Sequence, residues 1–171
     1  ILFIVVVIVI NMIMGVLDSK VVMEVDLTPN QVYGLTQESI DFVQGLDKDV
    51  EINILNSKDS FESGGQYYVQ AAAIIENYSK YSSRVTVNYV DLVKNPTFAA
   101  NYEDENIASN DVLIKCGEKH KLVKSSELFN SEMSYSTFSY VVTSSKAEQS
   151  VTSAMVNVTS DEITKVAILT G

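Results

Sequence analysis

The first seventeen residues form one uncharged apolar run, and no other segment restricts the possible folds as strongly. Residues 1–17 read ILFIVVVIVINMIMGVL. As a helix, this run would reach about 25 Å, close to the ~30 Å hydrocarbon core of a bilayer. A signal peptide would have a shorter apolar stretch and a small-residue cleavage site, and a buried helix of a small protein is rarely apolar on every side. We therefore predict a transmembrane anchor at 1–17, truncated at its N-terminus by the start of this sequence.

The charged residues after this run favour an extracytoplasmic domain. From Asp18 to Glu38 there are four acidic residues, and Lys20 is the only basic one. Cytoplasmic flanks of membrane spans are usually enriched in lysine and arginine. We therefore expect a single-pass protein of the cell membrane whose soluble domain lies on the outer side.

The composition excludes several classes of protein. A formal net charge of −10 over 171 residues argues against a nucleic-acid partner, because such affinity comes from cations that neutralise phosphates. One cysteine (Cys116) and one histidine (His120) exclude a disulfide within the chain, multi-cysteine metal sites and two-histidine metal sites. No phosphate-binding loop or hydrolase motif is present. We expect no catalytic, cofactor-binding or metal-binding residue.

Hydrophobic periodicity predicts a mixed α/β domain after the anchor. Residues 18–48 should form a connecting strand, at 21–27, and a helix capped by Thr36. Residues 130–145 are rich in serine and threonine, which indicates a loop or an exposed hairpin. The other expected elements are strands at 50–55, 85–90, 111–115 and 121–124, and helices from 66 to 81, 96 to 102 and 146 to 158.

This order of elements is the thioredoxin-like topology, and we assign residues 49–145 to a thioredoxin-like domain with a mixed sheet. The first crossover should join parallel strands, and the later pair should be an antiparallel hairpin. Residues 146–171 would then supply a helix and a strand, at 165–169, that lead into a second α/β domain missing from this sequence. An analogy of fold carries no chemistry by itself.

For the residues that could support catalysis, the sequence favours structural roles over catalytic ones. Thioredoxin-type redox chemistry needs two thiols at the start of the first helix, and residues 57–66 contain no cysteine. Cys116 and His120 could act as nucleophile and base, but side chains four residues apart across a tight turn do not reliably converge. A stripe from Tyr67 to Tyr81 has helical spacing, which favours a core position over a ligand groove.

One basic cluster stands out from the acidic chain, and we take it as a candidate partner-binding site. Residues 115–124 carry about +3, since Glu118 is the only acid among them. The cluster could face an acidic partner or anionic lipid headgroups. Alternatively, its lysines protect a hairpin edge against pairing with other strands. The candidate residues are Lys115, Lys119, His120, Lys121 and Lys124.

Five short segments follow one another in an order that resembles a known family. They are DLTPNQVYGLT at 26–36, LDKDVEI at 46–52, DLVKNP at 91–96, EQSVTSAM at 148–155 and KVAILTG at 165–171. Together with the apolar run they resemble GldG-like proteins, the gliding-motility-associated auxiliary components of ABC-type transport systems. Two departures stand out: Leu92 replaces the usual proline, and the chain ends before the histidine and glutamate that follow Gly171 in the family pattern.

The resemblance implies a membrane-anchored, extracytoplasmic accessory subunit without catalytic activity. Its partners would be a separate ABC permease and ATPase, and it would act by binding or scaffolding. Two other interpretations remain open at this point. The chain could be the extracytoplasmic ligand-binding or sensor domain of a signalling protein, or an anchored enzyme whose site lies in the missing domain.

Overall fold

The computed structural model describes residues 33–160. The expected anchor at 1–17 and the expected strands at 21–27 and 165–169 lie outside these residues. Within the described part, no helix is both long enough and apolar enough to cross a membrane.

A mixed four-stranded sheet forms the centre of the described domain, with strand order β2-β1-β3-β4. The strands are β1 (Val50–Ile54), β2 (Val85–Tyr89), β3 (Val112–Cys116) and β4 (Lys119–Val123). Strands β1 and β2 are parallel, whereas β3 runs antiparallel to both β1 and β4. The expected parallel crossover and the later antiparallel hairpin are therefore confirmed.

Helices connect and cover these strands. They are α2 (Gln37–Gln44), α3 (Lys58–Glu62), α4 (Gln66–Tyr81), α5 (Pro96–Ala100) and α6 (Ala147–Thr159), with short 3₁₀ helices η1 (Glu103–Glu105) and η2 (Ser125–Glu127). The Thr36 hydroxyl caps α2 by accepting a hydrogen bond from the Ser39 N–H. Helix α3 was not expected from the sequence. Its five residues are too few to show a period, although Ser57 caps it in the same way.

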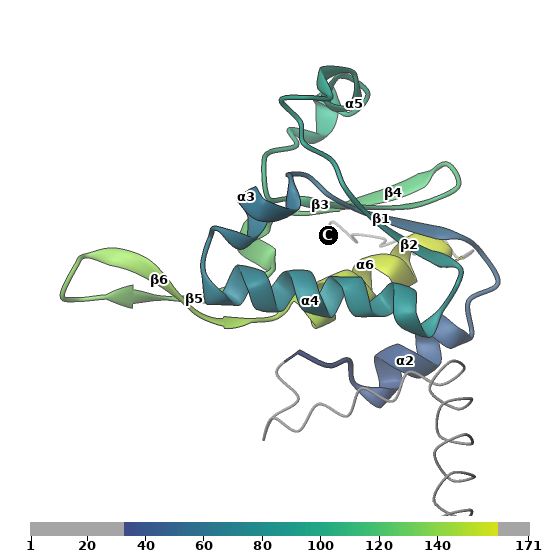
Figure 1. Ribbon diagram of the computed structural model, residues 1–171, viewed down its shortest axis with the longest axis horizontal. Coiled ribbons are helices and arrows are strands. Elements are labelled where there is room, and N and C mark those ends of the chain that lie inside the picture. The colour runs from purple at the N-terminus through teal and green to yellow at the C-terminus, as the bar shows by residue number, and fades with distance from the viewer. Residues whose placement is uncertain (1–32, 161–171) are drawn as a thin grey trace, which may run out of the picture. The chain divides into compact units, whose positions relative to one another are not determined.

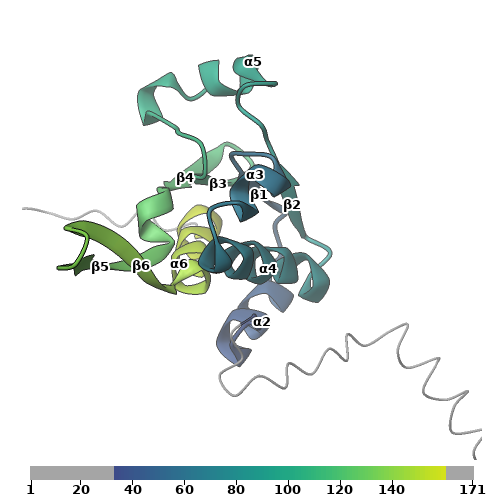
Figure 2. The same ribbon diagram turned by 60° about the vertical axis from the view of Figure 1, so that its left-hand side comes forward.

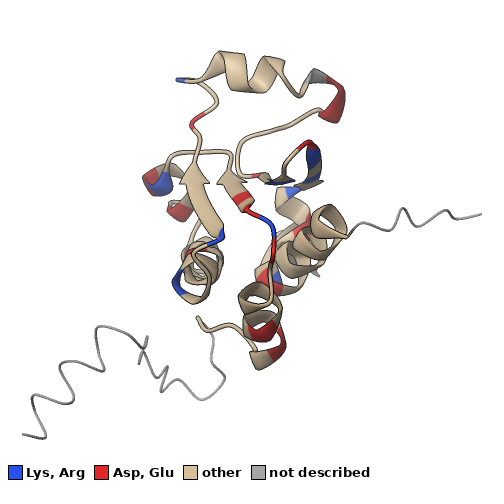
Figure 3. Cartoon of the chain, turned by 90° about the vertical axis from the view of Figure 1, so that its right-hand side faces the viewer, with Lys and Arg blue, Asp and Glu red and all other residues tan. Residues whose placement is uncertain are grey.

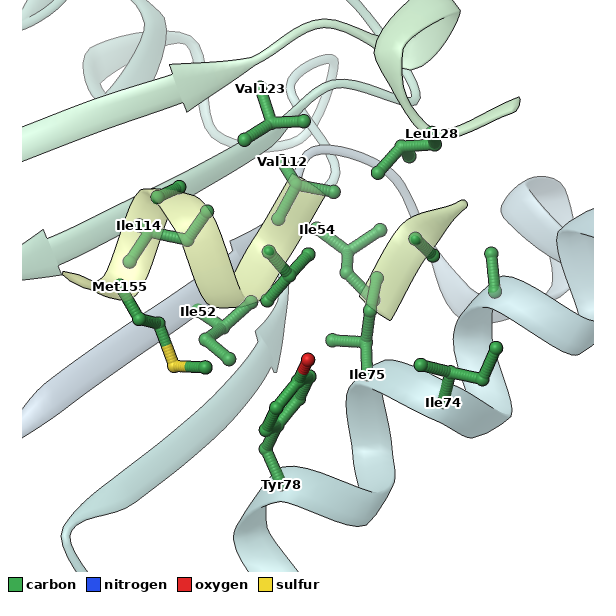
Figure 4. Packing of buried hydrophobic residues seen from close by; sticks show 14 of the residues in the cluster. Ile52, Ile54, Ile74, Ile75, Tyr78, Val112, Ile114, Val123, Leu128 and Met155 are labelled. Carbon is green, nitrogen blue, oxygen red and sulfur yellow. The ribbon is translucent and has the colours of Figure 1, made fainter. Parts of the chain in front are cut away.

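The elements form layers around the sheet. Figures 1 and 2 show α4 and α6 together on one face, α5 beyond the other face, and α2 on the far side of α4. The main core lies between the sheet and the α4–α6 layer, where Ile52 and Ile114 meet Ile75, Tyr78 and Met155 (Figure 4). All five residues are at most 1% exposed, and burying an isoleucine side chain fully stabilises a fold by about 1.5–3 kcal/mol.

Helix α6 contributes one apolar face to this core. Its buried residues recur at helical spacing: Ala147, Val151, Ala154, Met155 and Val158. The tyrosine stripe of α4 is likewise part of the core. Ala71, Ile74 and Tyr78 are buried, and Tyr67 and Tyr81 pack against the same cluster.

The opposite face of the sheet carries a second, smaller core. Leu55, Leu113 and Leu122 are buried there, and side chains from residues 90–107 cover them. This cover explains why Asn53 is only 3% exposed, although it lies on the face of the sheet away from the main core. Asn53 is satisfied in place, because its Nδ2 donates to the Leu113 carbonyl and its Oδ1 accepts from Asn88.

Residues 129–145 form a hairpin of β5 (Phe129–Ser134) and β6 (Ser139–Ser145), which makes a separate two-stranded sheet. Of the two alternatives expected for residues 130–145, a loop or an exposed hairpin, the structure has the hairpin. At its base, Phe129 is buried against the ring of Tyr68, with ring centroids 4.4 Å apart. The rest of the ribbon extends away from the layered body (Figures 1 and 2).

Candidate interaction surfaces

The basic cluster is divided between two faces of the β3–β4 hairpin. Cys116 pairs with Lys119 and Lys115 pairs with His120 across the two-residue turn. Because successive side chains of a strand point to opposite faces, Lys119 and Lys121 share the α6 side, while Lys115 and His120 lie on the other. The structure therefore does not bring the candidate residues together into one patch. Figure 3, viewed from the side toward which this hairpin extends in Figure 1, shows both basic and acidic residues spread over several elements.

Two cluster members pair with neighbouring acids. The Lys115 ammonium lies 3.9 Å from a carboxylate oxygen of Glu51. His120 Nε2 lies 3.2 Å from Glu105 Oε1, and the His120 ring meets the Tyr102 ring edge-on at 5.3 Å. These contacts attach the hairpin to β1 and to η1.

Lys124 is a structural cation. Its ammonium donates to the Asn106 carbonyl at 2.6 Å and lies 3.2 Å from Asp111 Oδ2. The Asp111 side chain is 3% exposed, and it also accepts the N–H groups of Ala108 and Ser125. One carboxylate thus joins the loop before β3 to the turn after β4.

Lys119 and Lys121 face a groove between β4 and α6. The groove has a volume of about 840 Å³, and Lys146 at the start of α6 also lines it. Lys119 donates to the Ser160 carbonyl at 2.6 Å, at the end of α6. A cation at a helix C-terminus complements the helix dipole, so Lys119 also has a structural role.

Cys116 and His120 do not form a catalytic pair. Cys116 is buried and belongs to the main core, whereas His120 lies on the opposite side of the hairpin beside Tyr102. A nucleophile needs its base within hydrogen-bond reach. In residues 33–160, no group of three or more histidine, cysteine or acidic side chains is placed to hold a metal ion.

The β5–β6 hairpin exposes large apolar side chains that the sequence analysis missed. Tyr135 is 82% exposed, Phe138 79% and Tyr140 75%, and Met133 lies opposite Tyr140 in the ribbon. Serine and threonine dominate the composition of this segment and obscured these rings. The sequence does contain an indication of an exposed aromatic surface, because aromatic residues lie on both sides of the turn in a stretch with one charge, Glu132.

Residues of two motifs meet in one hydrogen-bonded network beneath α4. Glu148 Oε1 accepts from both the backbone N–H and the hydroxyl of Thr36, each at 2.7 Å. Thr152 shares hydrogen bonds with Ser39 at 3.0 Å and with the Tyr78 hydroxyl at 2.7 Å. Segments 26–36 and 148–155 are therefore joined through side chains that hold α2, α4 and α6 together.

The motif segment DLVKNP at 91–96 forms a turn after β2. Asp91 Oδ1 accepts the N–H groups of Val93 and Lys94, and Asp91 Oδ2 lies 3.2 Å from the Lys94 ammonium. The hydrogen bond from the Lys94 side chain and those from the two N–H groups lower the pKa of Asp91. Local bonding of this kind by an aspartate stabilises a turn, so the KNP segment begins α5 from a defined conformation.

Comparison with known families assigns the chain to one family. No curated protein matches it. The family model described as "Domain of unknown function (DUF7088)" matches residues 29–132, from the approach to α2 through most of β5. This chain is therefore a member of the DUF7088 family of domains of unknown function.

Proposed function

We propose that the chain is a membrane-anchored, extracytoplasmic accessory subunit of an ABC-type transport system. It would act by binding or scaffolding with a separate permease and ATPase, with no reaction of its own. The order of the five motif segments supports the transporter assignment. The apolar run at 1–17 and its acidic flank support the anchor and its orientation.

The exposed aromatic hairpin is the observation that carries the binding role. Met133, Tyr135, Phe138 and Tyr140 are 46–82% exposed on one protruding ribbon. Contiguous apolar patches on a protein surface mark interaction sites, and aromatic residues and methionine are enriched at protein interfaces. Phe138 also has a φ of 48°, a left-handed conformation that is unusual for a bulky residue. These features suit a surface that another protein covers.

We further propose that the described domain is thioredoxin-like. The strand order β2-β1-β3-β4, the parallel β1–β2 pair and the antiparallel β3–β4 hairpin support this assignment. Helices α4 and α6 on one face and α5 on the other agree with it (Figure 2). The domain would use this fold as a scaffold, since the segment from Ser57 to Gln66 has no cysteine.

Copurification from membranes tests the proposal. The full chain is extracted in a mild detergent, and the proteins recovered with it are identified by mass spectrometry. We expect an ABC ATPase and a polytopic permease in stoichiometric amounts. Recovery of the chain alone, or with a signalling kinase, would refute the accessory role.

A hairpin variant then tests the surface. Tyr135→Ser/Phe138→Ser/Tyr140→Ser should lose the permease while its melting temperature stays within a few degrees of wild type, because these rings make few contacts within the fold. Val69→Ser/Val93→Ser is the matched control, since both valines are exposed outside the hairpin. Equal recovery of the permease with both variants would show that the hairpin is not the docking surface.

A further inference from the structure

The outer edge of β4 is open within the described part of the chain. Strand β4 is the last in the order β2-β1-β3-β4, so only β3 pairs with it there. Alternate residues of an edge strand direct their N–H and C=O groups outward, where an additional strand can bind them. Helix α6 packs against β3 and β4 and forms the wall of a groove of about 840 Å³ along this strand.

Three lysines line this groove in a chain of net charge −10. Lys119 and Lys121 come from β4, and Lys146 precedes α6. No acidic side chain among residues 33–160 forms an ion pair with Lys121 or Lys146. The one acid of the lining, Glu127, already accepts the Lys124 N–H at 2.8 Å. The groove therefore has a local positive charge that contrasts with the rest of the chain.

The other lining residues suit a peptide better than an exclusively charged ligand. The α6 wall presents the polar side chains of Gln149, Ser153 and Asn157. Leu122 and Val123 of β4 also contribute to the lining, so the groove combines apolar and polar surface. Peptides that add to an edge strand gain affinity from main-chain hydrogen bonds and specificity from alternate side chains.

We propose that this groove binds an extended acidic segment of a partner protein, which adds as a strand to the edge of β4. Lys119 and Lys121 are two positions apart on one face, about 6.6–7 Å along the strand. Carboxylates at alternate positions of the incoming segment face the same side with the same repeat. The ligand class is thus a peptide with acidic residues at every second position. The proposal does not rest on the transporter role.

Peptide binding to the full chain, kept soluble in a mild detergent, tests this proposal. The probe is a fluorescein-labelled octapeptide, Glu-Thr-Glu-Thr-Glu-Thr-Glu-Thr, and fluorescence anisotropy gives its Kd. Its matched control has the same composition in the order Glu-Glu-Thr-Thr-Glu-Glu-Thr-Thr, which turns half of the carboxylates away from the lysines. We expect saturable binding of the first peptide and at least a threefold weaker Kd for the second.

Lysine variants locate the site. Lys121→Ala/Lys146→Ala should weaken binding about fivefold to tenfold, since each substitution removes a cation near a ligand carboxylate. Lys94→Ala/Lys115→Ala removes the same charge outside the groove and should stay within twofold of wild type. Backbone N-methylation of the alternating peptide at every second residue should abolish binding, because the incoming strand loses its main-chain donors.

Four results would overturn the proposal. The first is equal affinity for both peptide orders, and the second is equal loss with both lysine pairs, since each would indicate attraction by charge alone. The third is binding of the chain to vesicles of phosphatidylcholine and phosphatidylglycerol through Lys121 and Lys146 without binding of the peptide, which would assign the groove to lipid headgroups. The fourth is a stable dimer of the chain that the peptide does not dissociate, which would assign the groove to a second copy.

Discussion

Replacement of Asp111 should destabilise this domain, because its buried carboxylate is the acceptor for three donors. Its carboxylate is almost completely buried and receives the Ala108 N–H at 3.0 Å, the Ser125 N–H at 2.8 Å and the Lys124 ammonium at 3.2 Å. Asp111→Asn keeps the shape of the side chain. It removes the charge and turns an NH₂ group toward groups that are themselves donors, so at least one hydrogen bond is lost.

The size of the effect follows from the exposure of the two partners. Removing one member of a buried ion pair costs about 3–5 kcal/mol, because the other charge is left without compensation. Lys124 is 41% exposed and retains the Asn106 carbonyl as an acceptor, so water can solvate it. The lower end of the range therefore applies, and we expect Asp111→Asn to reduce the free energy of unfolding by about 3 kcal/mol. Lys124→Met should cost at least as much, because it leaves the buried Asp111 carboxylate without its counter-ion.

Urea unfolding of the full chain, followed by far-UV circular dichroism, measures these differences. Asp47→Asn makes the same chemical change at an exposed position before β1, and it should stay within about 0.5 kcal/mol of wild type. The double variant Asp111→Asn/Lys124→Met should cost less than the sum of the single ones, since the two side chains interact. If Asp111→Asn unfolds at the same urea concentration as Asp47→Asn, the inferred role of the buried carboxylate is wrong.

Three further predictions concern α4 and its neighbours. Tyr78→Phe removes a buried hydroxyl bonded to Thr152 and should lower the free energy of unfolding by about 1–2 kcal/mol in the same urea assay. Burial raises the pKa of Tyr78 and Tyr89 above the usual value of 10. The unfolded chain therefore releases these phenolic protons at a lower pH than the folded chain does, and stability should fall as pH rises above about 10. Thermal melts across pH 8–11 measure this fall. Gly64→Ala should lower the melting temperature, because a Cβ there would lie 2.5 Å from the Tyr68 ring, whereas Ala substitution of exposed Ser79 should not.

Local patterns predicted the regular elements well, because each depends on near neighbours in the chain. The Thr36 cap is present, and the helix expected from 146 to 158 is α6. The burial of Asn53 could not be predicted in this way, because it depends on residues 90–107, which are distant along the chain and cover that face of the sheet. A short helix such as α3 is likewise determined by its cap and by one buried side chain, Phe61.

The basic cluster shows a different limit of prediction from sequence. The basic cluster was identified by proximity in sequence, but a strand sends neighbouring residues to opposite faces. The two-residue turn at Gly117-Glu118 pairs Cys116 with Lys119, and that register separates Lys119 and Lys121 from Lys115 and His120. This division was within reach of the sequence, since the turn was recognised there. The contribution of Lys146 to the same groove was not, because it depends on how α6 packs.

The motif residues that carry the family resemblance have structural roles, and these roles limit what the resemblance implies about function. Thr36, Glu148 and Thr152 hold three helices together, and Asp91 shapes the turn before α5. A chain can keep all four for its architecture whatever it binds, so their presence indicates a shared fold more strongly than a shared partner. Specificity must then come from side chains that the fold does not need. In residues 33–160 the aromatic rings of the β5–β6 hairpin and the groove residues Lys121 and Lys146 meet that description.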